Sequence, residues 1–192
     1  MNVVGLLLAA GSATRFGSDK LRHGLPHGVA IAVQAARHLK TEIGEVFAVV
    51  RPGADELKQL LEKEKCRVDF CGNAAEGMGA SLACAARAAG ERDAYLVALA
   101  DMPFVRPSSI AAVRDALAAG APLAAPFFHA RRGHPVGLAG SFYGELIALQ
   151  GDEGARKLLA NHAAALVKIP VGDPGVIRDI DTPGDLTPPA RV

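Results

Sequence analysis

Small residues and two cations follow the first apolar stretch of the chain. Val3 to Leu8 is continuously apolar, Ala9 to Gly11 come next, and Arg15 and Lys20 follow within ten residues. A phosphate can approach backbone N–H groups closely only where side chains are small, and nearby cations add to its attraction. The pattern predicts a loop that binds a polyphosphate. The residues expected to contact a nucleotide here are Leu8, Ala9, Ala10, Gly11, Arg15 and Lys20.

Two better-known phosphate loops do not match this segment. The dinucleotide fingerprint G-x-G-x-x-G needs a glycine two residues after Gly11, where this chain has Ala13. The P-loop needs lysine after glycine and before serine or threonine, whereas Lys20 lies between Asp19 and Leu21. An ordinary glycine-rich turn between a strand and a helix is the alternative interpretation.

Two acidic residues are expected at the carboxyl ends of strands. Asp101 follows the most apolar strand candidate, Ala94 to Ala100, and Asp181 lies in DIDTPGDL. Ligands of open α/β sheets bind outside the carboxyl ends of strands, and Mg²⁺ is commonly held by one or two carboxylates plus phosphate oxygens. We therefore expect Asp101 and Asp181 to bind Mg²⁺. Asp179 is an alternative to Asp181, and a turn or helix cap is the alternative role for each acid.

Three further segments could complete a site. In GMGASL, Gly77 and Ser81 are expected to offer free N–H groups and a hydroxyl at the start of a helix, unless that helix is capped by its own residues. In RRGHPVGL, His134 is expected to bind or orient an acceptor, while Arg131 and Arg132 are expected to form an exposed basic turn. In GDEGAR, Arg156 is expected to face the site.

The elements that must position these residues alternate along the chain. Apolar runs predict buried strands, and apolar residues at helical spacing predict helices between them. Alternation of this kind favours a three-layer α/β sandwich on a mostly parallel sheet. Strands are expected at 3–8, 46–50, 66–71, 94–100, 123–128, 166–171 and 177–180, with a short one within 131–138; helices are expected at 29–39, 55–65, 80–89, 107–120, 141–149 and 152–162. Pro126 places the strand at 123–128 near an edge.

Composition limits the remaining possibilities. The 192 residues are 50% hydrophobic and 21% charged, which predicts one domain over residues 1–192. A net charge of +1 without a basic stripe argues against nucleic acid as a partner. Three cysteines in no metal-binding spacing and no apolar segment of about 20 residues predict a cytoplasmic protein that does not enter a membrane.

Taken together, these motifs resemble the molybdenum cofactor cytidylyltransferase branch of the MobA-like nucleotidyltransferases. The likeness lies in LAAG with Arg15, Gly17 and Lys20, and then in GMGASL, LADMPFV, RGHPVGL, GDEGAR and DIDTPGDL, in order over nearly the whole chain. Ala13 departs from the family pattern, as does the segment after Lys20. The resemblance implies a Rossmann-like fold of the nucleotide-diphospho-sugar transferase type, an NTP in the first loop, and Mg²⁺ at Asp101.

The same resemblance implies a reaction. CMP from CTP would be joined to the phosphate of molybdopterin, a phosphorylated pterin, and pyrophosphate would leave. Arg15, Lys20 and Asp101 would act in catalysis, and Asp181 would help hold the metal. LAAG in place of LAGG favours CTP over GTP. The resemblance also implies transient contact of this protein with a molybdoenzyme or its chaperone. A sugar-phosphate nucleotidyltransferase and a non-catalytic chaperone for the cofactor are the alternatives.

Overall fold

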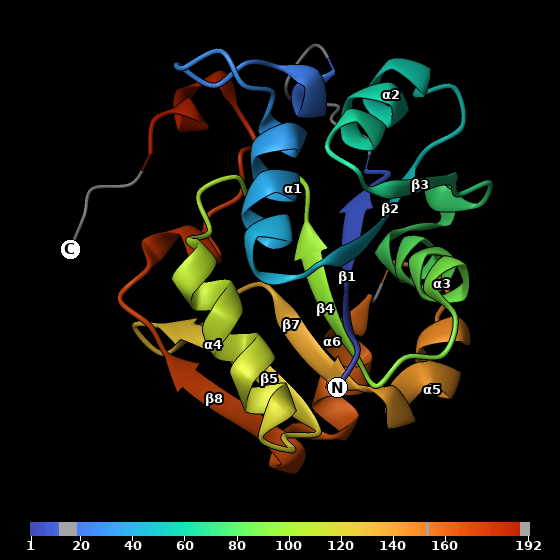
Figure 1. Cartoon of the computed structure of the whole chain (residues 1–192), viewed down its shortest axis with the longest axis vertical. Coiled ribbons are helices and arrows are strands. Elements are labelled where there is room, and N and C mark those ends of the chain that lie inside the picture. Colours follow the sequence, from blue (N-terminus) through green and yellow to red (C-terminus); the bar gives the residue numbers. More distant parts are fainter. Residues whose placement is uncertain (12–18, 153, 189–192) are drawn as a thin grey trace.

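The computed structural model describes residues 1–11, 19–152 and 154–188. Its centre is one mixed, mostly parallel sheet with the strand order β3-β2-β1-β4-β7-β5-β6, and β8 pairs with the other side of β5 (Figure 1). Strands β1 to β4 are parallel to one another, as are β5 and β8, whereas β7 is antiparallel to both β4 and β5. The strands are β1 (Val3–Ala9), β2 (Glu45–Val50), β3 (Arg67–Phe70), β4 (Ala94–Leu99), β5 (Leu123–Phe128), β6 (Arg131–Arg132), β7 (Val136–Ala139) and β8 (Leu166–Pro170).

Helices cover both faces of this sheet (Figure 1). One face packs against α1, α2 and α4, and the other against α3, α5 and α6. Successive residues of β1 show the division, because Leu7 belongs to the first apolar core while Leu6 and Leu8 belong to the second. The expected three-layer α/β sandwich is confirmed. The helices are α1 (Ile31–Glu42), α2 (Asp55–Lys63), α3 (Met78–Ala89), α4 (Pro107–Ala118), α5 (Tyr143–Ile147) and α6 (Ala155–Asn161).

Pro126 lies within β5, one strand in from the edge that β8 forms. The pairing of β5 with β7 ends at Ala124 and its pairing with β6 begins at Phe127. A proline has no N–H to donate, so its place between these two ladders costs no ladder hydrogen bond on that side. Its carbonyl oxygen accepts a hydrogen bond from the amide nitrogen of Gly133 at 2.8 Å. Pro126 thus lies where the sheet branches.

Two expectations about elements were wrong. The segment 177–180 is no strand: a 3-10 turn spans Pro174–Ile177, and the chain then runs extended to Asp181. The helix expected from Asp152 begins only at Ala155, because Gly154 at its start has a positive φ of 52°. Both differences affect the site. Among the described residues, no helix is long and apolar enough to cross a membrane.

Candidate active site

A cleft of about 990 Å³ opens at the carboxyl ends of β1, β2 and β4. It is lined by Leu8, Ala10 and Gly11 after β1, by Arg51 and Pro52 after β2, and by Asp101 after β4, together with Lys20, Gly77, Ser81, Asp152 and Asp181 among others. We call it the first cavity. These segments meet because β1 lies between β2 and β4 and is parallel to both, so all three strands end at the same edge. The sequence-based expectation that Gly11 and Asp101 lie near one another is borne out by this arrangement.

The loop after β1 is described only at its start. A Cβ atom added at Gly11 would meet no other atom of the described residues within 4 Å. Ala9 lies in the apolar core and does not line the cavity, which leaves only its backbone for contact with a nucleotide. Arg15, expected to contact the phosphates, lies outside the described residues, as does Gly17.

Lys20 brings the two predicted acids together. Its Nζ atom lies 3.0 Å from Oδ2 of Asp101 and 3.4 Å from Oδ1 of Asp181, and its side chain is only 10% exposed. Burial lowers the pKa of the ammonium group, but the two carboxylates outweigh this effect and raise the pKa of Lys20 above its usual value. Lys20 is therefore charged at neutral pH. It links three segments that are far apart in the sequence.

Asp101 is held in place by its backbone rather than by capping a helix. Its carbonyl oxygen accepts a hydrogen bond from the amide nitrogen of Ile180 at 2.9 Å, which joins the end of β4 to the segment that carries Asp181. Burial raises the pKa of Asp101 above its usual value, although the charge of Lys20 lowers it in part. A nearby cation stabilises the charged form of a carboxylate in such a buried position.

The capping role considered for Asp181 is filled by its neighbours. Thr182 and Asp185 form the capping box of the last 3-10 turn, with Asp185 Oδ2 accepting from the Thr182 amide nitrogen at 2.9 Å and hydroxyl at 2.7 Å. The Asp181 carboxylate instead accepts a hydrogen bond from the Nζ atom of Lys20 at 3.4 Å. Asp179 is exposed and does not line the first cavity. Of the two alternatives, the geometry favours Asp181.

Asp101 and Asp181 could together hold a divalent cation. No group of three or more His, Cys, Asp or Glu side chains forms a fuller metal site within the described part of the chain. Magnesium commonly needs only one or two carboxylates, with substrate phosphates and water supplying the other oxygens. Two carboxylates that share one ammonium group fit this requirement, because a cation already satisfies both.

The start of α3 is occupied by other backbone, in contrast to the expected free N–H groups. The amide nitrogen of Gly79 donates to the carbonyl oxygen of Gly151 at 2.8 Å, and that of Met78 to Asp152 Oδ1 at 3.3 Å. The Ser81 hydroxyl donates to the carbonyl oxygen of Gly77 within its own helix at 3.2 Å. The capped helix is therefore the correct alternative. Gly77 and Ser81 still line the first cavity.

A second cavity of about 530 Å³ adjoins the first. The two share Leu8, Met78, Leu99 and Asp152 in their walls. The residues that line the second cavity but not the first are three with basic side chains and five apolar ones: Arg132, His134, Arg156, Leu82, Val97, Val136, Ala155 and Leu159. The structure thus brings His134 and Arg156 together, as their expected shared role in binding an acceptor requires.

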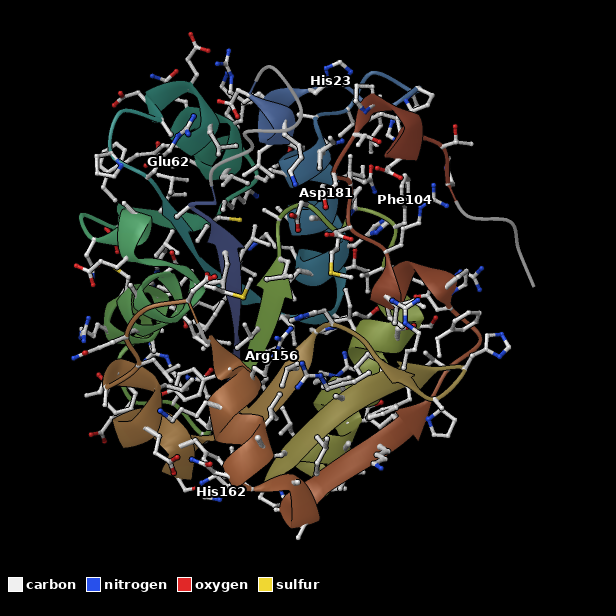
Figure 2. The ribbon with its side chains drawn as sticks, turned by 180° about the vertical axis from the view of Figure 1, so that it is seen from behind. His23, Glu62, Phe104, Arg156, His162 and Asp181 are labelled. Carbon is white, nitrogen blue, oxygen red and sulfur yellow. The ribbon has the colours of Figure 1, made fainter. Side chains whose placement is uncertain are left out.

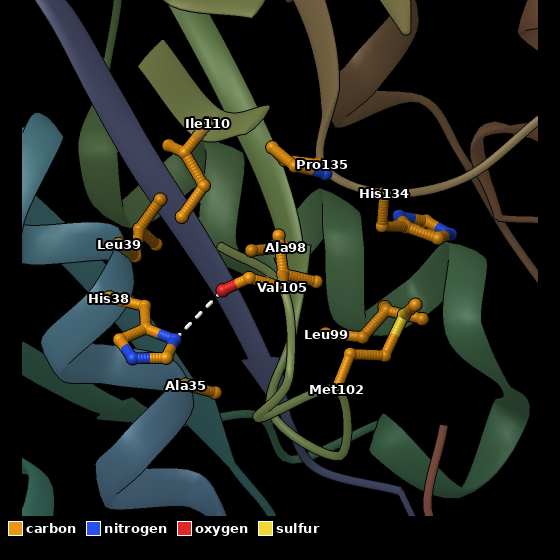
Figure 3. Close-up of a pocket in the computed structure, with 10 residues that line it drawn as sticks. All are labelled: Ala35, His38, Leu39, Ala98, Leu99, Met102, Val105, Ile110, His134 and Pro135. Carbon is orange, nitrogen blue, oxygen red and sulfur yellow. Dashed lines mark hydrogen bonds between the residues drawn. The ribbon is translucent and has the colours of Figure 1, made fainter. Parts of the chain in front are cut away.

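His134 is held firmly and is uncharged. Its amide nitrogen donates to the carbonyl oxygen of Val176 at 2.8 Å, and a Cβ atom at Gly133 would lie 2.3 Å from that same oxygen. The pKa of His134 is lowered to about 4, mainly by burial and in smaller part by the charge of Arg132, against an opposing effect of the Val97 carbonyl. The buried Nδ1 atom has no hydrogen-bond partner among the described residues. Figure 3 shows the ring beside a small apolar cavity, with His38 on its other side.

Two residues of the site were not predicted. Arg132 is exposed, as expected, but its side chain also lines the second cavity. Asp152 was expected as the first residue of a helix, whereas it lies between the cavities and bonds to α3. No local pattern distinguishes these roles, because both depend on how α6 packs beside α3 and β6.

Known structures share this fold over nearly the whole chain. Rv0371c from Mycobacterium tuberculosis superimposes with a TM-score of 0.82 at 22% identity, over 96% of this chain and 95% of that one, and it has also been solved with manganese. A nucleotidyl transferase from Methanothermobacter superimposes with a TM-score of 0.80 at 21% identity, over 95% of this chain and 93% of that one. Molybdopterin-guanine dinucleotide biosynthesis protein A from Archaeoglobus fulgidus superimposes with a TM-score of 0.66 at 20% identity, over 95% of this chain and 94% of that one. Likeness at this identity shows the fold alone.

A comparison with curated proteins gave no match. The family comparison matched residues 5–166 to the MobA-like NTP transferase domain. This range includes the loop after β1, Lys20, Asp101, His134 and Arg156, and it takes in most of the chain. The chain therefore belongs to the MobA-like NTP transferase family and is a nucleotidyltransferase.

Proposed function

We propose that this protein transfers CMP from CTP to the phosphate of molybdopterin and releases pyrophosphate. The observation that carries the proposal is the position of Lys20, which joins Asp101 and Asp181 at the edge of a cavity that begins at the small-residue loop after β1. A cation between two carboxylates beside an open backbone suits a triphosphate and its metal ion. The second cavity then receives the acceptor.

The transfer makes one bond and breaks one. An oxygen of the acceptor phosphate forms a bond to the α-phosphorus of CTP, and the bond from that phosphorus to the pyrophosphate oxygen breaks. The acceptor phosphate is already ionised, so no general base is required. Lys20 and Arg15 offset the negative charge that develops on the departing pyrophosphate. Such reactions depend mainly on positioning and electrostatic stabilisation.

A divalent ion, Mg²⁺ in this proposal, would be held by Asp101 and Asp181 and would neutralise part of the phosphate charge when bound. The manganese form of Rv0371c supports a divalent ion in this fold but does not select Mg²⁺. His134 and Arg156 contact the acceptor from the second cavity. The similar structure of molybdopterin-guanine dinucleotide biosynthesis protein A from Archaeoglobus fulgidus supports a pterin acceptor, although the name of that protein specifies guanine.

The preference for CTP rests on Ala10, which takes the place of a second glycine and narrows the first cavity by one methyl group. One methyl group is a modest discriminator, commonly worth about 1 to 3 kcal/mol. We therefore expect CTP to have the highest kcat/KM, by about 10- to 200-fold.

The test is pyrophosphate release from CTP, GTP, ATP and UTP, each with and without molybdopterin. CTP-dependent release that requires molybdopterin supports the whole proposal. A higher kcat/KM for GTP would overturn the choice of base and leave the acceptor standing. Release with a sugar phosphate but not with molybdopterin would overturn the acceptor. Tight molybdopterin binding without release from any NTP would favour a chaperone.

A further inference from the structure

Two guanidinium groups line the second cavity without an ion pair to any described residue. Arg132 comes from β6 and Arg156 from α6, and both side chains line this cavity. Neither makes a hydrogen bond or an ion pair with another described residue. Asp152 lines the same cavity, yet its carboxylate bonds to the amide nitrogen of Met78 and to neither arginine within 4 Å. Both arginines are therefore available to a ligand.

The two charges are close enough to disfavour one another. Burial lowers the pKa of Arg132, and the charge of Arg156 lowers it further. Placing two cations together without an anion is unfavourable, and an anion between them would reverse the sign of the interaction. Guanidinium groups bind phosphate and carboxylate through paired hydrogen bonds, which makes two of them a suitable anion site.

The other walls of the cavity are apolar. Leu82, Val97, Val136 and Leu159 line this part of the cavity, and the neutral ring of His134 lies beside them. A small anion alone would leave this surface exposed to water. A compact organic body with an anionic group at one end would cover the apolar wall and also reach the arginines.

The arginines are distinct from the charges of the first cavity. Lys20, Asp101 and Asp181 line only the first cavity, and Arg132 and Arg156 only the second. On β4, Val97 lies in the wall of the second cavity, Leu99 lines both cavities, and Asp101 lines only the first. Figure 2 shows Arg156, on α6, and Asp181, in the segment after Ile177, apart from one another. A group bound by the two arginines therefore lies apart from the site of Asp101 and Asp181.

We propose that Arg132 and Arg156 bind a second anionic group of the acceptor, distinct from the phosphate that receives the nucleotide. The acceptor is then a compact molecule with anionic groups at two ends and an apolar or planar body between them. The inference rests on the proposed function insofar as that function assigns the second cavity to the acceptor. It adds Arg132 as a residue that selects the acceptor by charge.

Side-chain NMR can test the anion site without turnover. The ¹⁵N-labelled protein is titrated with inorganic phosphate, and the Nε–H signals of Arg132 and Arg156 are followed. We expect both signals to shift together and to saturate. Arg132→Gln should weaken the phosphate affinity read at Arg156 by at least about tenfold, because one charge-assisted contact is lost. Arg67→Gln, which removes a cation at the opposite edge of the sheet on β3, should leave it unchanged.

Two further measurements connect this site to the acceptor. Lys20→Met should leave the phosphate affinity at the arginines unchanged, since Lys20 belongs to the other cavity. In the transfer reaction, Arg132→Gln should raise KM for the acceptor at least about tenfold and leave KM for the NTP unaltered. Shifts that do not saturate, loss of phosphate binding in Lys20→Met, or an unchanged acceptor KM would each overturn the inference. Saturable phosphate binding without transfer to any acceptor would contradict the proposed function while the anion site stands.

Discussion

Replacing Lys20 by methionine should strengthen metal binding and weaken catalysis at the same time. Methionine has a similar length and no charge. The Lys20 ammonium group lies 3.0 Å from Asp101 and 3.4 Å from Asp181, so it would compete with a divalent ion for both carboxylates. A metal ion must displace this ammonium group from at least one carboxylate. Without Lys20, the carboxylates repel one another until a metal ion arrives.

The size of the effect follows from these two contacts. A hydrogen bond between charged groups commonly contributes about 1.5 to 3 kcal/mol, and a side chain that is 10% exposed is screened little by solvent. Giving up one such contact is equivalent to roughly 10- to 100-fold in affinity. We expect the nucleotide-free Lys20→Met protein to bind Mn²⁺ more tightly by about this factor. Turnover should fall by a similar factor, and by more than NTP affinity does, because the charge is needed as pyrophosphate leaves.

Calorimetric titration with Mn²⁺ measures the first quantity, and steady-state pyrophosphate release measures the second. Lys63→Met removes an exposed lysine on α2 and serves as the matched control. Mn²⁺ affinity that stays the same or falls in Lys20→Met would refute the idea that Lys20 competes with the metal ion for these carboxylates. Equal losses in NTP affinity and turnover would instead show that Lys20 stabilises the bound triphosphate equally in the ground state and the transition state.

Three other changes have definite expected outcomes. Asp101→Ala and Asp101→Asn should abolish metal-dependent turnover but leave the circular dichroism spectrum unchanged, and near wild-type turnover at low Mg²⁺ would remove Asp101 from the metal site. Asp173→Ala should lower the free energy of unfolding in urea by about 2 to 4 kcal/mol, because its buried carboxylate accepts hydrogen bonds from the Ser109 hydroxyl and the Arg106 amide, both at 2.8 Å. The free energy of unfolding should also fall by about 3 kcal/mol as the pH is lowered from 6.5 to 4, because His134 binds a proton in this range in the unfolded chain but not in the folded one. This part of the pH dependence should be absent in His134→Gln.

The parts of the site that could be predicted lie directly after apolar strands. Continuous apolar runs identify β1 and β4, and such strands are parallel neighbours in the sheet. Once that is expected, Gly11 and Asp101 must lie at the same edge. The positions of these residues follow from local sequence plus one general rule about α/β sheets, whereas their roles stay predictions.

The position of Asp181 depends on contacts that the local sequence does not reveal. The apolar residues at 177–180 are typical of a strand, but the segment is held by other means. Buried Asp173 accepts a hydrogen bond from the Gly175 amide at 2.9 Å, and the Ile180 amide donates to Asp101. These hydrogen bonds replace a strand ladder, and they aim Asp181 at Lys20. A pattern of apolar residues cannot distinguish the two cases.

The boundary between the two cavities explains why the transfer needs so few reacting side chains. The attacking oxygen must approach the α-phosphorus from the side opposite to the departing pyrophosphate. In the proposed reaction, a nucleotide in the first cavity and an acceptor in the second would meet where the cavities adjoin, beside Leu8 and Leu99, so attack would occur between the cavities. Close packing fixes this boundary, because a Cβ atom at Gly77 would lie 2.5 Å from the Cα atom of Asp152. A side chain at position 77 would move Asp152 and the helix that carries Arg156, and the two substrates would lose their alignment while every charged group remained present.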